Sequence, residues 1–404
     1  MNRLYLLDHH LLNPKFGGGG WTHVTNVVKF LVKEFEITLV PRSTTLFYSD
    51  EDVERKAGEV ERLGVKVLES YWDARKRVRK ELSRLDKLLP YRLSEKYSKA
   101  LNVNLENLYE PDHLGFDVFY LASNAYAFVM HEPVYYDDSL DYLKRLVKFY
   151  GVNVRTGKGF HTRFLYNELV AKKAKGLIED RPPKLVGAVS RGVLEWSGLE
   201  GEVLFPGNAF ERELMAFRCR GKEDYVMFWA RLNQDKGVLE LLDVMARLRN
   251  RTKLVVTGKF FDTYYEKKFW AKAKKLGVDV EYLGFVDRKT LLEKASRARL
   301  LVYPSHVDGF SLTVLESLAL GTPVVAYSIP TIRSVYGGLP GVKLVGEFDV
   351  TSMAKASDEF LQMGEKELCD VMNDEKLLKF LELHSSWENV AREHLRLIKK
   401  AFGE

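Results

Sequence analysis

Short apolar runs of strand length alternate with stretches of helical periodicity along most of the chain, and this series begins twice. In the first series, strands are expected at 4–7, 38–40, 65–68, 118–122, 128–130 and 184–189. In the second, strands are expected at 225–229, 253–257, 280–283, 300–303, 324–326 and 343–345, with helices at 237–248, 264–276, 288–297 and 313–320. Strands that are separated by helices pair in parallel and are covered on both faces. The sequence therefore predicts two consecutive Rossmann-like α/β units.

The length of 404 residues is enough for two domains, each with its own hydrophobic core. A hydrophobic fraction of 46% and a charged fraction of 29% are typical of a soluble globular protein. The longest apolar stretch, 116–130, is too short and too polar to cross a bilayer, and the apolar run at the N-terminus ends too early for a signal peptide. Cys219 and Cys369 are expected to be reduced thiols, so the protein is predicted to be cytoplasmic.

Positive charge is concentrated in one segment. The formal net charge of +6 does not call for nucleic acid as a partner, but residues 75–99 hold ten basic and three acidic side chains, with leucines at 82, 85, 88 and 89. A basic amphipathic helix of this kind can lie on an anionic membrane as a peripheral contact on its cytoplasmic face; the alternative is a helix packed on its own domain with a solvated face. The use of many lysines, arginines and glutamates with only two glutamines is common in hyperthermophile proteins.

The most specific segment, 303–325, joins a strand, a loop and a helix that carry two carboxylates eight positions apart. Asp308 in the loop can accept hydrogen bonds from sugar hydroxyls, and Glu316 on the helix can accept both hydroxyls of a ribose. The amides at the start of the helix suit a diphosphate, because they carry the positive end of the helix dipole. Gly309 lets the backbone approach a ligand closely.

This segment resembles the donor-site signature of glycosyltransferase family 4, in which two glutamates are separated by seven residues and a Gly-Thr-Pro-Val-Val run follows, here at 321–325. Asp308 stands where the family has its first glutamate; it keeps the charge but has a shorter reach, so it is expected to tune which sugar is accepted. The resemblance implies that the donor is bound by Gly309, Phe310, Ser311, Leu312, Thr313 and Glu316.

A second match lies at 228–237, which resembles the Gly-Arg-Leu-x-x-x-Lys-Gly element of the same family with Ala230 in place of the first glycine. Arg231 and Lys236 are then expected beside the donor pyrophosphate, where their charge would stabilise the leaving diphosphate. The resemblance also places the turns at Gly258 and at 285–286 (Phe285 and Val286) around the nucleobase.

In the first unit, the run Gly17, Gly18, Gly19 and Gly20 resembles the family's glycine loop, which faces the acceptor and the donor phosphate. His131 falls where the family places a histidine near the reacting centre. The family's last helix bears a tryptophan and crosses back onto the first domain, which Trp387 suggests for this chain. The resemblance implies a GT-B fold, two Rossmann-like domains facing each other across a cleft, with an acceptor-side domain at 1–207, a donor domain at 208–385 and the crossing helix at 386–404.

The resemblance further implies a retaining hexosyltransferase that moves a sugar from a UDP- or GDP-linked donor to an acceptor hydroxyl on a glycan or a lipid-linked molecule. Catalytic roles would fall to Arg231, Lys236, Asp308 and His131. No cofactor is expected, and no metal, because the adjacent pair His9 and His10 lacks a ligand spacing. The chain also lacks a Gly-Lys-Ser/Thr phosphate loop.

Two alternatives share the expected architecture. A sugar-nucleotide epimerase would also hold a nucleoside diphosphate but would need no acceptor, and the element at 228–237 with the acidic pair favours the transferase. A non-catalytic subunit would bind a nucleotide sugar without transferring or hydrolysing it, and the change to Asp308 keeps this alternative open.

Overall fold

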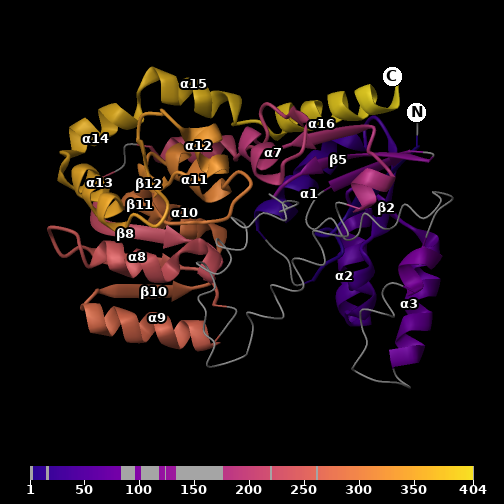
Figure 1. Ribbon diagram of the computed structural model, residues 1–404, viewed down its shortest axis with the longest axis horizontal. Coiled ribbons are helices and arrows are strands. Elements are labelled where there is room, and N and C mark those ends of the chain that lie inside the picture. Colours follow the sequence, from indigo (N-terminus) through magenta and orange to yellow (C-terminus); the bar gives the residue numbers. More distant parts are fainter. Residues whose placement is uncertain are drawn as a thin grey trace.

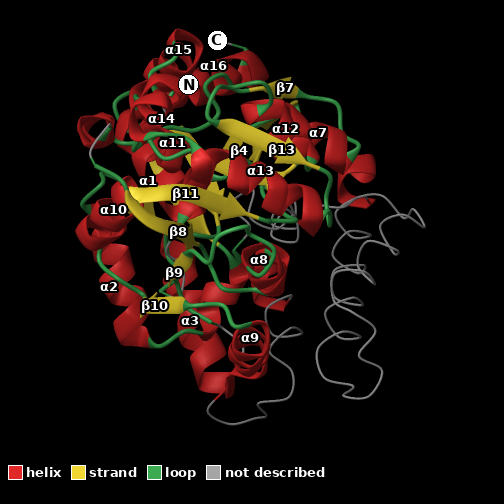
Figure 2. Ribbon diagram, turned by 90° about the vertical axis from the view of Figure 1, so that its left-hand side faces the viewer, coloured by secondary structure: helices red, strands yellow, loops and turns green. Residues whose placement is uncertain are grey.

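The computed structural model describes residues 3–14, 18–82, 96–101, 118–122, 124–132, 176–218, 221–260 and 263–403. These residues form two open sheets, one in each half of the molecule, with helices on both faces of each (Figures 1 and 2). The expectations for Gly17, for Cys219 and for the middle of the basic segment, 83–95, fall outside the described residues. The GT-B arrangement of two Rossmann-like units is confirmed, and the domain boundaries at 207 and 385 stay predictions.

The first sheet has seven strands in the order β3-β2-β1-β4-β5-β6-β7. Its strands are β1 (Arg3–Asp8), β2 (Glu36–Pro41), β3 (Lys66–Val67), β4 (Val118–Ala122), β5 (Ala125–Met130), β6 (Leu185–Ala188) and β7 (Glu202–Val203). Its described helices are α1 (Gly19–Leu31), η1 (Ser43–Phe47), α2 (Asp50–Glu61), α3 (Glu69–Leu82) and α7 (Arg191–Ser197). The prediction of an amphipathic helix at α1 is confirmed, because its apolar residues Val24, Val27, Val28 and Leu31 are all buried.

The prediction of a wholly parallel first sheet is wrong at β4. This strand runs antiparallel to both of its neighbours, β1 and β5. Only residues 123 and 124 separate β4 from β5, and a parallel crossover needs a dozen residues or more. A connection this short allows only a hairpin, so β4 had to turn back along the sheet.

The second sheet has six strands, all parallel, in the order β10-β9-β8-β11-β12-β13. They are β8 (Glu223–Trp229), β9 (Lys253–Thr257), β10 (Val280–Gly284), β11 (Ala298–Tyr303), β12 (Val324–Tyr327) and β13 (Val342–Val345). The helices around them are η3 (Arg212–Phe217), η4 (Gln234–Lys236), α8 (Val238–Met245), α9 (Thr263–Leu276), α10 (Arg288–Arg297), α11 (Leu312–Ala319), α12 (Pro330–Tyr336), α13 (Val350–Gln362), α14 (Glu365–Met372) and α15 (Glu375–Leu383). Every strand predicted in this half is present. The inner strands β9, β8, β11 and β12 are mostly buried, and the edge strands β10 and β13 are half-buried.

The last helix, α16 (Trp387–Phe402), packs against α1 and the first sheet, so both ends of the chain lie in the same half of the molecule (Figure 1). Its buried side includes Val390, His394 and Leu397. A Cβ atom on Gly187 of β6 would lie 2.2 Å from a methyl of Leu397, so a glycine at this position lets the helix approach the sheet.

The expectation of two reduced thiols is wrong for Cys369 on α14, which is disulfide-bonded. The other cysteine of the sequence, Cys219, lies outside the described residues. Spacing along a chain does not show whether two cysteines come within the short Cα separation that a disulfide needs.

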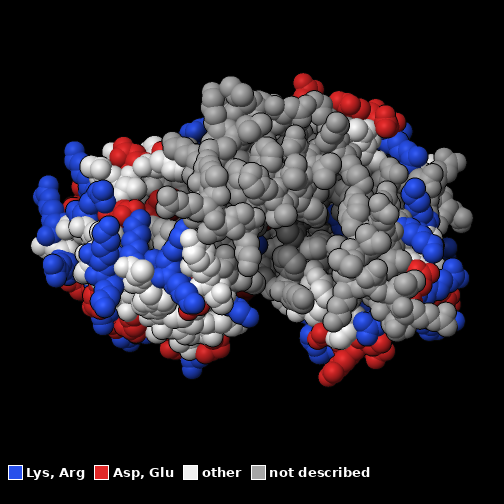
Figure 3. All heavy atoms as spheres, turned by 60° about the horizontal axis from the view of Figure 1, so that its bottom comes forward, with Lys and Arg blue, Asp and Glu red and all other residues white. Residues whose placement is uncertain are grey.

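In the described part of the basic segment, not every basic side chain is exposed to solvent. Arg75 is buried, donates to the carbonyl oxygens of Thr45 and Tyr48 at 3.0 and 2.6 Å, and pairs with Asp50 at 2.6 Å. Figure 3 shows lysines and arginines on the second-sheet half as well, where α9 exposes lysines at 267, 268, 274 and 275. Among the described residues, no helix is both long and apolar enough to span a membrane.

Candidate active site

The candidate site lies where the strand order of the second sheet reverses. From β8 the chain builds outward to β9 and β10, then returns to place β11 on the other side of β8. Ligands of open α/β sheets bind at such a switch point, outside the carboxyl ends of the strands. The loop after β8 carries Arg231 and Lys236, and the loop after β11 carries Asp308.

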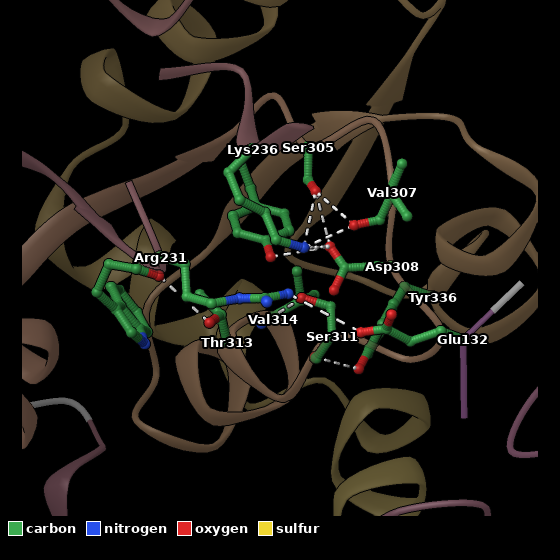
Figure 4. A network of polar contacts seen from close by, with 12 residues as sticks. Glu132, Arg231, Lys236, Ser305, Val307, Asp308, Ser311, Thr313, Val314 and Tyr336 are labelled. Atoms are coloured by element: carbon green, nitrogen blue, oxygen red, sulfur yellow. Dashed lines mark hydrogen bonds and ion pairs between the residues drawn. The ribbon is translucent and has the colours of Figure 1, made fainter. Parts of the chain in front are cut away.

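Lys236 and Asp308, predicted from separate motifs, form a buried ion pair (Figure 4). The Lys236 Nζ atom lies 3.0 Å from Oδ2 of Asp308 and donates to the Val307 carbonyl oxygen at 2.6 Å, and the two side chains are 7% and 13% exposed. Gly237 makes this approach possible, since a Cβ there would lie 2.0 Å from the carbonyl oxygen of Pro304. Burial alone would lower the pKa of Lys236, but the charge of Asp308 outweighs it and raises this pKa.

Asp308 is held by its own loop as well. Its Oδ2 atom also accepts hydrogen bonds from the Tyr303 hydroxyl at 2.9 Å and from the Ser305 hydroxyl at 2.8 Å. Burial and the Asp308 charge raise the pKa of Tyr303 to about 12, so this hydroxyl stays a donor at neutral pH. Asp308 thus anchors Lys236 and the loop, a role that the sequence did not predict.

Arg231 faces Glu132 across the space between the two sheets. Glu132 follows β5 of the first sheet, and its Oε1 atom lies 3.9 Å from Nη2 of Arg231, with the two side chains 38% and 44% exposed. The crowding of protein around Glu132 raises the pKa of its carboxyl, and the charges of Arg231 and Lys236 offset only part of this. A carboxylate that is crowded yet still open to solvent lies in the wall of a cleft.

The two halves come into close contact at Gly309 and His131. A Cβ atom on Gly309 would lie 1.6 Å from the His131 carbonyl oxygen, so only glycine fits. The Ser190 hydroxyl of the first half donates to the Gly309 carbonyl at 2.7 Å. Burial, followed by the neighbouring histidines, holds the pKa of His131 well below its usual range. His131 is therefore a neutral imidazole at the wall of the cleft.

The starts of α1 and α11 lie close together beside this cleft. A Cβ on Gly19 would lie 3.3 Å from a methyl of Leu312, the first residue of α11. Ser311, at φ 65°, turns the chain into α11, and its hydroxyl accepts from the Val314 amide at 3.4 Å (Figure 4). Gly18 adopts φ 119° at the start of α1. Two helix N-termini with glycine-lined backbone between them favour a bound anion.

Glu316 sits one turn inside α11 and pairs with an arginine that the motif reading missed. Nη2 of Arg288 lies 2.7 Å from Oε1 of Glu316 and 2.8 Å from Oε2 of Glu211. Burial raises the pKa of Glu316, and Arg288 counteracts this rise. The sequence held one signal for Arg288, because a cation at the first position of a helix opposes the helix dipole and usually needs a carboxylate nearby.

The residues expected around the nucleobase lie at the ends of β9 and β10. Gly258, at φ 139°, could not carry a side chain, because a Cβ would lie 1.9 Å from the Ala230 carbonyl oxygen. Its own carbonyl accepts from the Tyr282 hydroxyl at 2.9 Å. The ring of Phe285 is 87% exposed, and Val286 is half-buried. The structure therefore brings the backbone of Gly258 to the site and leaves the Phe285 ring in solvent.

Metal ligation has no support among the described residues, where no group of three His, Cys, Asp or Glu side chains is placed to hold an ion. Of the adjacent pair noted in the sequence, His10 bonds through Nδ1 to Asp8 at 3.0 Å and takes part in the turn after β1. Its ring also fills the space beside Gly20, where a Cβ would lie 2.2 Å from Nε2 of His10.

Two Rossmann-like units, with the switch-point loops of the second opposite glycine-lined backbone of the first, form the GT-B fold. Solved structures share this fold along almost the whole chain. Sucrose-phosphate synthase from Thermosynechococcus elongatus superposes with a TM-score of 0.64 at 14% identity, covering 98% of both chains. The Anabaena protein HepE, solved in complex with UDP and glucose, gives 0.61 at 12% identity, again over 98% of both.

Residues 211–376 match the family model of the glycosyl transferases group 1. An uncharacterized glycosyltransferase of Methanocaldococcus jannaschii is 28% identical over 234 residues, 55% of this chain and 56% of that protein. Glycogen synthase of Mycobacterium tuberculosis is 30% identical over 139 residues, 32% of each chain. The chain thus matches about half or less of the length of these curated relatives.

Proposed function

We propose that this protein transfers a hexose from a UDP- or GDP-linked donor to an acceptor hydroxyl, with retention of anomeric configuration. The observation that carries the proposal is the buried Lys236–Asp308 pair, held beside the N-terminus of α11 and opposite the start of α1. A buried cation next to two helix N-termini is suited to a diphosphate. The match of residues 211–376 to the glycosyl transferases group 1 and the fold shared with a UDP-bound protein support the same assignment.

In this mechanism the bond from the anomeric carbon to the leaving phosphate oxygen breaks, and the bond to the acceptor oxygen forms on the same face of the sugar. The acceptor proton passes to the leaving diphosphate, so the protein supplies position and charge. Of the contacts of the Lys236 ammonium, the one to the Ser305 hydroxyl is longest, at 3.4 Å, and a phosphate oxygen can replace it. Arg231, 44% exposed at the mouth of the cleft, can add a second cation.

Glu316 would accept the ribose hydroxyls, with Arg288 keeping its carboxylate ionised. Asp308 would act mainly through Lys236, because its Oδ2 atom already has three donors. Neutral His131 adds no charge to the opposite wall of the cleft, where the sugar and the acceptor would meet. This division of roles explains why a shorter carboxylate can serve at position 308.

For the acceptor, we propose a hydroxyl on a glycan or a lipid-linked molecule, with residues 75–99 as a contact to an anionic membrane on its cytoplasmic side. Co-sedimentation of the full chain with vesicles of anionic and of neutral lipid, at low and high salt, tests this contact. Binding that is specific to anionic vesicles and lost in high salt is expected. Equal binding to both kinds of vesicle, or to neither at low salt, contradicts it.

The transfer itself is tested by first screening nucleoside diphosphates and their sugars for a rise in melting temperature. The donor that binds is then incubated with and without candidate acceptors, and the product's anomeric configuration is read by NMR. Transfer with retention is expected, and inversion contradicts the mechanism. Isomerisation of the donor without an acceptor would indicate an epimerase. Binding without transfer or hydrolysis would indicate a non-catalytic subunit.

A further inference from the structure

Histidines from three distant parts of the chain meet in a buried junction behind the cleft. His23 lies on α1, His131 follows β5, and His394 lies on α16. The ring of His23 stands edge-on to that of His131 with centroids 4.2 Å apart, and its Nε2 atom lies 2.9 Å from Nε2 of His394. His23 and His394 are 1% and 0% exposed, so their polar atoms depend on partners within the protein.

The partners at the two ends of this group determine the direction of its hydrogen bonds. The side-chain oxygen of Asn208 accepts from the Ala209 amide at 3.2 Å and lies 3.2 Å from Nδ1 of His23. Because an oxygen of this kind only accepts, Nδ1 of neutral His23 carries the hydrogen and Nε2 is an acceptor. Nε2 of His394 must then donate to it, and Nδ1 of His394 accepts from the Tyr120 hydroxyl at 2.5 Å. Every donor in this chain of bonds meets an acceptor.

The chain of bonds requires neutral imidazoles. A second proton on His23 would sit on Nε2 and point at the hydrogen of His394. Burial lowers the pKa of His23 to about 4, and the hydrogen bond to Asn208 offsets this only in part. Burial, followed by the nearby His23, holds the pKa of His394 well below its usual range. The directions of the bonds therefore hold at neutral pH.

Asn208 connects this junction to the other half of the molecule. It lies in the segment between β7 and β8, where the chain passes from one sheet to the other. Its carbonyl oxygen accepts from Nδ1 of His384 at 2.7 Å, and the His384 carbonyl accepts from the Phe210 amide at 3.0 Å. The His384 ring packs on Phe310, with centroids 5.5 Å apart; Phe310 lies in the loop between β11 and α11 (304–311, the donor loop). Asn208, where the chain passes from one sheet to the other, is thus bonded to His23 of the first half and to His384 of the second.

We propose that His23 is a positioning residue for His131: the hydrogen bonds to Asn208 and His394 fix the plane of the His23 ring, which in turn orients His131 at the cleft. This inference rests on the proposed transfer reaction. Because the His131 carbonyl lies against Gly309, a displaced His131 also moves the donor loop. Among the described residues, the hydrogen-bond and ring partners of His23 are Asn208, His394, Trp387 and His131, and of these only His131 is a predicted site residue. The effect of His23 on the reaction therefore passes through His131.

Histidine tautomers test the bond directions independently of catalysis. The full chain, labelled with ¹⁵N-histidine, is compared with the His23→Gln and His394→Gln variants to assign the two rings among the nine histidines. The expected spectrum shows His23 protonated on Nδ1 and His394 on Nε2. A His23 ring protonated on Nε2 overturns the chain of bonds, whatever the activity of the protein.

Kinetics of two His23 variants test the positioning. Glutamine places an amide donor and an oxygen acceptor at about the spacing of the two ring nitrogens, so His23→Gln can keep both bonds. His23→Phe keeps a ring against His131 but loses both bonds. We expect His23→Phe to lower kcat by about tenfold or more with little change in the donor KM, because a small misplacement near the chemistry is costly. His23→Gln should recover most of kcat.

Tyr120→Phe is the matched control, because it removes one hydrogen bond from the same buried chain, the one from the Tyr120 hydroxyl to His394. Its melting temperature should fall, as in His23→Phe, while kcat stays within about twofold of wild type. An equal loss of kcat in Tyr120→Phe, or wild-type kcat in folded His23→Phe, overturns the positioning role. If wild type transfers no sugar, the proposed function fails, and the tautomer measurement still decides the bond directions.

Discussion

The two walls of the cleft differ in their charge and in the size of their side chains. The wall from the second sheet is charged, with Lys236 paired to Asp308 and Arg288 paired to Glu316. The described wall opposite consists mainly of glycine backbone at Gly18 to Gly20 and a neutral histidine, with Glu132 at its edge. The wall from the second sheet can therefore bind a charged leaving group, and the wall from the first sheet lets its backbone come close to a ligand. Charge is concentrated where a diphosphate would sit, and the opposite wall is shaped by how closely the backbone can approach.

The largest effect is expected from Lys236→Ala, which breaks the charged wall. Turnover should fall by roughly a hundredfold to a thousandfold, since a cation at a leaving group stabilises charge in the transition state. Stability should also fall by about 3 kcal/mol, because Asp308 is left as a buried unpaired charge. Kinetics with the identified donor and denaturant unfolding measure the two losses.

The double variant Lys236→Met with Asp308→Asn separates these losses. It removes both buried charges, so much of the stability should return while turnover stays low. Lys272→Ala serves as a control, because Lys272 pairs with Asp243 on the surface. Wild-type turnover in folded Lys236→Ala would show that the charge of Lys236 does not stabilise the leaving group.

Gly309→Ala disrupts the contact between the two walls at Gly309 and His131. The new methyl would lie 1.6 Å from the His131 carbonyl oxygen, so the two halves must separate. We expect turnover to fall by about tenfold to a hundredfold and stability by roughly 1–3 kcal/mol. Gly58→Ala is the control: a Cβ there meets nothing within 4 Å, and the residue lies inside helix α2. Unchanged kinetics in Gly309→Ala would show that the walls need not touch.

Arg288→Ala tests whether Arg288 keeps the carboxylate of Glu316 ionised. Without Arg288, burial and Glu211 both raise the pKa of Glu316 further. A protonated carboxyl is a poorer acceptor for ribose hydroxyls, so donor affinity should fall by roughly tenfold near neutral pH. The loss should deepen as the pH falls through the raised pKa and recover as the pH rises above it.

Titration calorimetry with the nucleoside diphosphate across this pH range measures the effect. Arg297→Ala is the control on the same helix, because Arg297 pairs with Glu223 away from the site. A pH profile identical to that of wild type would mean that Arg288 does not hold the ionisation of Glu316.

Phe285→Ala should have the smallest effect. The ring is 87% exposed, and removal of an exposed side chain changes stability by about 0.5 kcal/mol or less. If only the backbone of this turn borders the nucleobase, nucleotide affinity should change by less than about twofold. A tenfold weaker affinity by calorimetry would show that the ring closes over the base when the ligand binds.

Local pattern was enough to predict most of the fold. Helix α10 was expected at 288–297 and is found as Arg288–Arg297, and β9 matches equally well at Lys253–Thr257. Such segments follow from side-chain periodicity and burial on both faces, which neighbouring residues specify. The direction of β4 was missed because strands were expected at 118–122 and 128–130, with five residues between them. Strand β5 begins at Ala125 instead, and the two residues that remain allow only a hairpin.

The sequence by itself determined the two Rossmann-like units, and it predicted the parts of a candidate site: a glycine loop, and Arg231, Lys236, Asp308 and Glu316 near strand ends. Only the tertiary structure decided which of these side chains bond to each other. Lys236 and Asp308 are 72 positions apart and His23 and His394 are 371 apart, and nothing in their local patterns marks them as partners. Pairing depends on how strands and helices far apart in the chain are brought together, and burial then makes each pairing matter, because a buried polar group left without its partner is costly.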